Sequence, residues 1–278
     1  MRPIFLAMAA ASFAWAQAQY KVPATCTLEL VQQLDLTCAV DSPCPLYLEL
    51  SDVELVGERL ILAGNIHTTD TTLDSVLLVS DDGGKSWTEG HARIPAGVLA
   101  DIQFLDFESG WISGHLLRSD AREPFFLITG DGGKTWRKRP IYSEPKSGAI
   151  EQFRFDSRTS GKVTVDRGQG AERAVRYELW ESMTSGDSWN VRQVDSRPIP
   201  LPGGPRAETK AIRIRPDAKS KSYQIERSEG NRWRAVASLA VNVGECKPEP
   251  PETKEQPPVV DEPPPAAPPA SPPKGKKE

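Results

Sequence analysis

The stretch SDDGGKSW at residues 80–87 recurs almost residue for residue as TGDGGKTW at residues 129–136, and both copies follow the pattern S/T-x-D-x-G-x-S/T-W. A degenerate third copy, SMTSGDSW, occupies residues 182–189, and a fainter fourth, ERSEGNRW, occupies residues 226–233. Gly and Trp keep their places in all four copies, and successive Trp residues lie 44–53 positions apart. Self-similarity at this period indicates a repeat architecture such as a propeller.

The residue types of the repeated motif suit a tight turn followed by a strand. Asp82 and Asp131 can accept backbone N–H bonds within the turn, and Gly84 and Gly133 can adopt a positive φ. The Trp that ends each copy can supply a large apolar body between neighbouring sheets. We therefore predict a structural role, rather than catalysis or calcium binding, for thirteen positions. They are Ser80, Asp82, Gly84, Trp87, Thr129, Asp131, Gly133, Trp136, Ser182, Gly186, Trp189, Gly230 and Trp233.

The segments between the motifs favour short strands. The segment IQFLDFESGWISG at residues 102–114 is typical of a strand, a tight turn and a second strand, and FFLI at residues 125–128 is typical of a third. The next repeat has FRFD at residues 153–156 and KVTV at residues 162–165 in the corresponding places. Four short strands per repeat make one propeller blade. The expected fold is therefore all-β, with a β-propeller-like array of about four blades over residues 46–246.

The segment F-x-D-x-x-x-G-W-x-x-G at residues 104–114, followed by DGGKTW at residues 131–136, resembles the Asp-box (BNR) repeat. The chain is most similar to the photosystem II stability/assembly-factor-like repeat proteins, closely over residues 98–141 and loosely over residues 46–243. The resemblance implies a β-propeller in which each box joins the third and fourth strands of a blade and lies away from active sites. Those relatives have more than four blades, so no functional residue is carried over from them.

Both ends of the chain differ from its middle. Residues 1–18 combine Arg2, an apolar run and an Ala16-Gln17-Ala18 cleavage site, which predicts a secretory signal peptide, with a membrane anchor as the alternative. Proline dominates residues 247–278, which predicts a disordered tail. No later run of about 20 apolar residues occurs, so we expect no transmembrane segment after signal cleavage. The expected location is secreted or periplasmic.

Four cysteines are present, and export favours disulfides. The near-palindrome CTLELVQQLDLTC at residues 26–38 predicts a β-hairpin within an N-terminal segment, residues 19–45, and would place Cys26 opposite Cys38. Cys44 and Cys246, which flank the repeats, would then fasten the two ends of the array. Four cysteines allow three connectivities, and a Cys38–Cys44 bond would contradict this assignment.

Composition argues against several kinds of site. His67, His91 and His115 lack metal-ligand spacing, so we expect neither a metal nor a cofactor, and no nucleic-acid partner. Residues 20–136 carry 18 acidic against 7 basic side chains, whereas residues 137–246 carry 14 against 21. This asymmetry suggests attraction between opposite ends of the domain, within one chain or between two chains of a homo-oligomer.

The chain contains no G-x-S-x-G, zincin or P-loop motif. We therefore expect a non-catalytic binding or assembly module for a protein or glycan partner in the cell envelope. Candidate positions on the strand-connecting turns at the mouth are Asp52, Asp106, Trp111, Asp156 and Arg158. One alternative is a sialidase-type glycoside hydrolase, which needs an arginine cluster, a Tyr–Glu pair and an acidic Asp. Another is a self-assembling structural protein of the envelope.

Overall fold

The computed structural model describes residues 19–117, 122–168, 176–201 and 210–248. The leader predicted for residues 1–18 and nearly all of the tail predicted for residues 247–278 lie outside these ranges. Within them, no helix is both long and apolar enough to span a bilayer.

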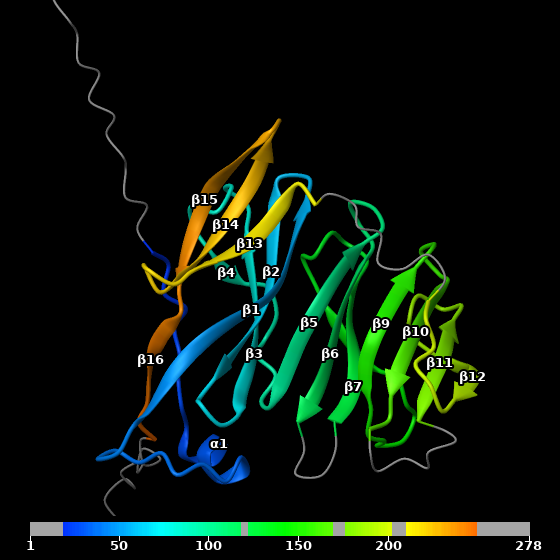
Figure 1. Cartoon of the computed structure of the whole chain (residues 1–278), viewed down its shortest axis with the longest axis horizontal. Helices are drawn as coiled ribbons and strands as arrows, with labels where there is room; N and C mark the ends of the chain where they lie inside the picture. The colour runs from blue at the N-terminus through cyan, green and yellow to red at the C-terminus, as the bar shows by residue number, and fades with distance from the viewer. Residues whose placement is uncertain (1–18, 118–121, 169–175, 202–209, 249–278) are drawn as a thin grey trace, which may run out of the picture.

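The described chain forms four antiparallel sheets, which confirms the all-β, propeller-like architecture (Figure 1). Sheet 1 has the order β16-β1-β2-β3-β4, with β1 Cys44–Val56, β2 Arg59–His67, β3 Thr72–Ser80, β4 Thr88–Glu89 and β16 Asn242–Cys246. Sheet 2 comprises β5 Gly97–Phe104, β6 Gly110–Leu117, β7 Arg122–Thr129 and β8 Arg137–Pro140. Sheet 3 comprises β9 Ala149–Phe155, β10 Gly161–Asp166, β11 Tyr177–Ser182 and β12 Asn190–Asp195. Sheet 4 comprises β13 Ile212–Asp217, β14 Ser222–Glu229 and β15 Arg232–Ala240.

The sheets stand face to face in a row, with sheet 4 at one end and sheet 3 at the other (Figure 1). β1 packs against both β13 and β5, and β9 packs against β6 and β7. β2 and β3 are buried almost throughout because sheet 1 is covered on both faces. The strand farthest along sheet 3, β12, is instead exposed along nearly its whole length.

Alternation along each strand sends one set of side chains to each neighbouring sheet. Between sheets 1 and 2, a core forms from residues such as Ile61 and Leu77 on one side and Ile112 on the other. Between sheets 2 and 3, Trp111 stacks on Phe155 with ring centroids 3.8 Å apart. These two interfaces, with the core between sheets 1 and 4, account for the apolar faces that the strand pattern predicts.

The outer faces of the two end sheets are polar. In sheet 3, Val163 points into the core shared with sheet 2, so Lys162, Thr164 and the register partner Glu181 occupy the opposite face. In sheet 4, Ile225 lies in the core shared with sheet 1, and Glu226 points away from it. Polar outer faces are typical of the terminal repeats that cap a repeat array.

The acidic and basic residues are distributed unevenly over the row of sheets. The acidic half of the chain forms sheets 1 and 2 in the middle of the row, and the basic half forms most of sheets 3 and 4 at its two ends. Within that half, residues 212–240 of sheet 4 carry 7 basic against 3 acidic side chains, whereas residues 149–168 and 176–195 of sheet 3 carry 6 against 7. Sheet 4 is therefore the basic end of the row and sheet 3 is close to neutral, and attraction between the ends stays a prediction.

The hairpin predicted between Cys26 and Cys38 is wrong, because the segment contains a short helix, α1, spanning Leu28–Gln33. Thr27 caps this helix, and its Oγ1 accepts a hydrogen bond from the backbone N–H of Leu30 at 3.2 Å. Leu30 and Val31 are buried on one side. The palindrome lacks a Gly or Asn for a tight hairpin turn, whereas its Thr27-x-x-Leu30 start favours a capped helical turn.

Ahead of α1, the N-terminal segment completes the edge of sheet 4. Tyr20 pairs with Leu239 of β15, donating its backbone N–H to Ser238 at 2.7 Å and accepting one from Ala240 at 2.9 Å. Val22 is fully buried in the core shared by sheets 1 and 4. The first residues of the described chain thus lie beside the last repeat.

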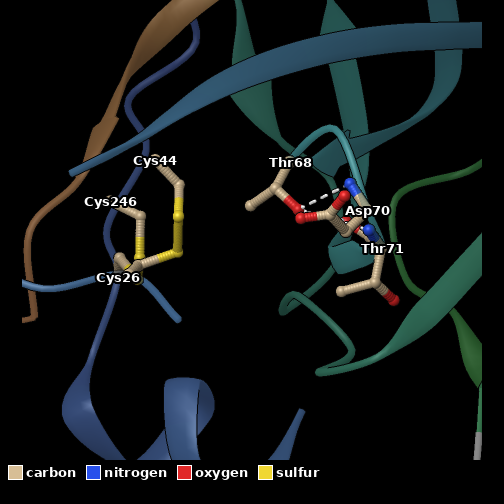
Figure 2. Close-up of a disulfide and its surroundings, with 7 residues drawn as sticks. Cys26, Cys44, Thr68, Asp70, Thr71 and Cys246 are labelled. Carbon is tan, nitrogen blue, oxygen red and sulfur yellow. Dashed lines mark hydrogen bonds between the residues drawn. A yellow bond between two sulfur atoms is a disulfide. The ribbon is translucent and has the colours of Figure 1, made fainter. Parts of the chain in front are cut away.

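The disulfides also differ from the expected pairing. Cys26 bonds Cys246 (Figure 2), and Cys38 bonds Cys44. The predicted Cys26–Cys38 and Cys44–Cys246 pairs are therefore wrong, although Cys44 does face Cys246 in the register of β1 and β16. Because α1 replaces the hairpin, Cys26 lies beside the end of β16 instead of opposite Cys38. The Cys26–Cys246 bond still fastens the two ends of the repeat region.

We expect the two disulfides to contribute unequally to stability. In the chain-entropy model, a bond across 220 residues stabilises by about 5 kcal/mol, against about 2 kcal/mol for one across 6 residues. Replacing Cys26 and Cys246 with Ser should therefore lower the free energy of unfolding far more than replacing Cys38 and Cys44. Urea unfolding followed by Trp fluorescence measures both. Equal losses, or peptide mapping that finds Cys44–Cys246, would contradict the connectivity described.

Candidate functional site

The two strong Asp boxes are carboxylate-centred turns. Asp82 accepts backbone N–H groups of Lys85 and Ser86, both at 2.9 Å, and the hydroxyl of Ser80 at 2.8 Å. Asp131 makes the same bonds in the second box, with Thr129 in the place of Ser80. Hydrogen bonds from the box hydroxyls and backbone hold the pKa of Asp82 well below its usual range. Both carboxylates are saturated by their own turns.

The third box works without a carboxylate. Thr184 stands in the place of the Asp, and its Oγ1 accepts the backbone N–H of Ser188 at 2.9 Å. Ser182 Oγ accepts the N–H of Gly186 at 2.9 Å, as Ser80 does for Gly84. A hydroxyl can therefore replace the carboxylate where it reaches the same donor.

The fourth motif is not an Asp box. Glu229 pairs directly with Arg232, so Gly230 and Asn231 form the two central residues of a tight hairpin between β14 and β15. Gly230 has a φ of +63°, which suits a two-residue hairpin turn. The box role predicted for Gly230 and Trp233 is therefore wrong, because no Asp or Thr occupies the third position and the Gly–Asn pair closes the hairpin instead.

The three true boxes sit at the boundaries between sheets. A Cβ added to Gly133, whose φ is +78°, would lie 2.6 Å from Ile61 of sheet 1. Gly186 approaches Ile128 of sheet 2 in the same way, and Gly84 approaches Ala237 of sheet 4. Each box thus places a positive-φ glycine against the neighbouring sheet, where a Cβ would force Ile61 to shift at Gly133 and would be tight, at 3.0–3.1 Å, at Gly186 and Gly84. The boxes are packing elements and offer no free ligand-binding group.

Of the five predicted mouth residues, four have local roles. Trp111 is 1% exposed, and its Nε1 donates to Ser185 of the third box at 2.8 Å. Asp106 accepts from two backbone N–H groups of its own turn and pairs with Arg158 at 2.8 Å. Asp156 pairs with Arg154 at 2.5 Å. The structure thus brings Asp106 and Arg158 together in an ion pair between the β5–β6 and β9–β10 turns, whereas Trp111 is buried.

Asp52 is the exception, because it lies in a groove of about 400 Å³ between β1 and β13. We call this the β1–β13 groove; its lining comprises Ser51, Asp52, Val53, Lys210, Ile212, Arg213, Ile214 and Trp233. A bulge in β1 after Leu50 turns Asp52 toward β5, where it accepts the backbone N–H of Ile102 at 2.9 Å. Lys210 donates to both carboxylate oxygens of Asp52, at 2.7 and 2.8 Å.

The other end of the groove carries an arginine stacked on an indole. The guanidinium of Arg213 lies 4.1 Å from the ring centroid of Trp233, and Trp233 is 39% exposed. Arg213 and Arg215 both bind the buried carboxylate of Glu226, each with a shortest contact of 2.7 Å. Burial favours a higher pKa for Glu226, but the two arginines outweigh it and lower the pKa. The arginines stay fixed on the sheet while their outer edges face solvent.

The chemistry of the groove favours binding. Burial lowers the pKa of Lys210, but Asp52 and Glu54 outweigh it, so the pKa is raised and the ammonium stays charged. Ser51 donates its hydroxyl to the carbonyl of Leu99 at 2.7 Å rather than to a base. The groove therefore presents two held cations, an indole and an aliphatic floor. Sequence reasoning missed Lys210 and Arg213, and it assigned Trp233 to a turn.

A second cluster surrounds Glu178 in sheet 3. Its carboxylate accepts from Tyr142 at 2.9 Å, Lys146 at 3.2 Å, Arg167 at 2.9 Å and Trp180 at 2.8 Å. Burial and the adjacent carboxylate raise the pKa of Tyr142 far above its ordinary value, so the phenol stays protonated. A tyrosine nucleophile must give up its proton, whereas the phenol of Tyr142 is held protonated. The four donors that converge on Glu178 indicate a structural role for the pair.

Comparison with known proteins gave matches in structure only. No protein-family model matches the chain, and no curated protein matches it. One solved structure, "YCF48 bound to D1 peptide", aligns with a TM-score of 0.36 and 16% identity, covering 69% of this chain and 57% of that one. The GH93 α-L-arabinofuranosidase of Fusarium graminearum with arabinobiose aligns with a TM-score of 0.34 and 14% identity, covering 78% and 62%. The chain therefore spans less than two thirds of the length of these matches. At such scores they carry no argument about activity or ligand.

Replacing Asp131 with Ala should destabilise the fold by about 2 kcal/mol, because it leaves two backbone N–H groups and two hydroxyls without their acceptor. The matched control is Asp81→Ala, which removes only an exposed ion pair with Arg59 and should cost less than about 0.5 kcal/mol. Urea denaturation measures both. Equal effects would show that the box carboxylate has no special role.

His115 should make stability depend on pH. Burial, helped by Arg122, lowers the pKa of His115 to about 4 from 6.5. The unfolded chain therefore takes up this proton first, and stability falls as the pH drops from 6.5 to about 4, by up to about 3 kcal/mol. His115→Gln should remove that part of the loss. Identical unfolding-against-pH profiles for the two proteins over this window would contradict the prediction.

Proposed function

We propose that this chain is an exported, non-catalytic binding module that holds a protein partner along the β1–β13 groove. The observation that carries the proposal is the composition of the groove, where Lys210 and Arg213 flank an exposed indole and an aliphatic floor. Exposed Trp and Arg are the residue types that contribute most to binding energy at protein interfaces. Two disulfides and the predicted leader support export.

The partner chemistry that suits this groove is an extended segment with an acidic side chain next to an apolar one. A carboxylate can approach Arg213 from solvent, and an apolar side chain can lie against Ile214 and Trp233. β13 is the edge strand of sheet 4, so its outer side can pair with an added strand. The backbone then supplies affinity and the groove supplies specificity.

The second candidate function is a sialidase-type hydrolase, and a Tyr–Glu pair is the observation that bears on it. Tyr142 and Glu178 do form a Tyr–Glu pair beside Arg167. However, all four donors converge on Glu178, and the phenol is held protonated. The pair therefore favours a structural role, and binding remains the better reading.

Peptide display on the full chain tests the proposed function. We expect enriched sequences to combine Asp or Glu with a neighbouring large apolar residue. Arg213→Glu or Trp233→Ala should weaken binding of the enriched peptides about tenfold or more, which corresponds to 1.4 kcal/mol. Arg192→Glu is the matched control, because it makes the same charge change on sheet 3.

Two results would overturn the proposal. One is enrichment that is insensitive to Arg213→Glu and Trp233→Ala. The other is hydrolysis of an aryl glycoside by the purified chain that is lost in Glu178→Gln, since that would favour the hydrolase.

A further inference from the structure

A second groove, of about 420 Å³, lies at the opposite end of β13 from the β1–β13 groove. We call it the Tyr47–Tyr223 groove. Tyr47 comes from the start of β1 and Tyr223 from β14, and both are half-buried. Pro216 and Val241 add apolar lining, and Lys221 contributes a cation from the β13–β14 turn. Nothing in the proposed function uses this groove.

The lining has the composition of a site for proline-rich chain. Grooves lined by aromatic side chains bind polyproline II segments, whose extended shape costs little entropy to fix. Tyrosine suits this purpose because its ring packs on a pyrrolidine while its hydroxyl can donate to a peptide carbonyl. A stack of proline, valine and proline side chains would match the apolar walls.

The chain itself supplies such a segment. Residues 249–278 follow the described structure, and the run QPPVVDEPPP occupies residues 256–265. The described chain ends next to sheet 1, where Pro248 is buried just after β16. β16 begins at Asn242, which lines the groove.

The lengths are compatible with a return of the tail to the groove. β16 has five residues and spans about 17 Å, at about 3.3 Å per residue. A segment of eight residues, the number between 249 and 256, can reach about 25 Å if it is extended as in polyproline II. The tail can therefore turn back along β16 and reach the groove with the run at residues 256–265.

Charge favours the same placement. Residues 249–263 carry five carboxylates against the single cation of Lys254. Lys219 and Lys221 are exposed at the rim of the groove, and the carboxylate of Asp217 accepts the backbone N–H of Lys219 within the turn. An acidic, proline-rich segment thus meets cations at the rim and tyrosines in the floor.

We propose that the Tyr47–Tyr223 groove binds the chain's own tail through residues 256–265. A tether of this length gives an effective concentration of about 1 mM. A contact with a Kd of about 0.1 mM between separate molecules is then occupied about ten to one within one chain. The tail is held on the domain, and a stronger proline-rich ligand from outside can displace it.

Zero-length carbodiimide crosslinking of the full chain tests the proposal. At low protein concentration, Lys219 and Lys221 should couple to Asp261 or Glu262 at about ten times the yield found for Lys85 and Lys134, the control lysines of the Asp boxes. The yield should fall to the control level when Pro257, Pro258, Pro263, Pro264 and Pro265 are changed to Ser. Those changes lie outside the described domain and leave every lysine in place.

A groove variant, Tyr47→Leu, should lower the same crosslinks, with Tyr177→Leu on sheet 3 as the matched control. If Tyr47→Leu unfolds the domain, the proline variant decides alone. Equal yields at all four lysines, or yields unchanged by the proline variant, would overturn the proposal. A mixture of ¹⁵N-labelled and unlabelled chains tests whether the bound tail belongs to a second copy of the chain. Crosslinks that mostly join the two isotopes would assign the groove to the tail of a second copy and overturn binding within one chain.

Discussion

The close approach of a box glycine to the preceding sheet is the contact on which the rest of the structure depends. Gly133 has a φ of +78°, which L side chains rarely adopt, and a Cβ there would force Ile61 to shift. Asp131 fixes that turn by collecting the donors of the box on one carboxylate. The hydrogen bonds to one carboxylate thereby set the spacing between two sheets.

The same arrangement explains why the boxes tolerate different chemistry. Thr184 replaces the carboxylate in the third box and keeps the bond to the backbone of Ser188. Gly186 then still approaches Ile128. In the fourth motif no side chain reaches those donors, the Gly230–Asn231 hairpin forms instead, and Trp233 is released to the surface. The indole of Trp233 is exposed beside Arg213, which is where the proposed binding site lies.

The polar groups of the protein fall into two kinds: those whose hydrogen bonds are all made within the structure, and those that can still bind a ligand. The carboxylates of Glu178 and of the boxes accept hydrogen bonds from the donors that surround them. Their acceptor capacity is therefore used within the structure and not offered to a ligand. Arg213 is likewise paired, but the contact with Glu226 fixes its guanidinium without using all five N–H donors, and its outer edge faces solvent. Lys210 differs, because Asp52 and the carbonyl of Val53 engage the three donors of its ammonium.

Sequence alone determined the repeat unit, the all-β class, the positions of several inner strands of the sheets and the turn role of the two strong boxes. These follow from local chemistry, because an Asp, a Gly and a Trp at fixed spacing satisfy one turn whatever surrounds it. Tertiary structure decided the disulfide pairing, the helix at Leu28–Gln33 and the polar faces of the end sheets. It also decided that Asp52, Lys210 and Trp233 share one groove, although up to 181 positions separate them in sequence. Such groupings depend on which sheets become neighbours, and that is set by packing between distant segments rather than by any local pattern.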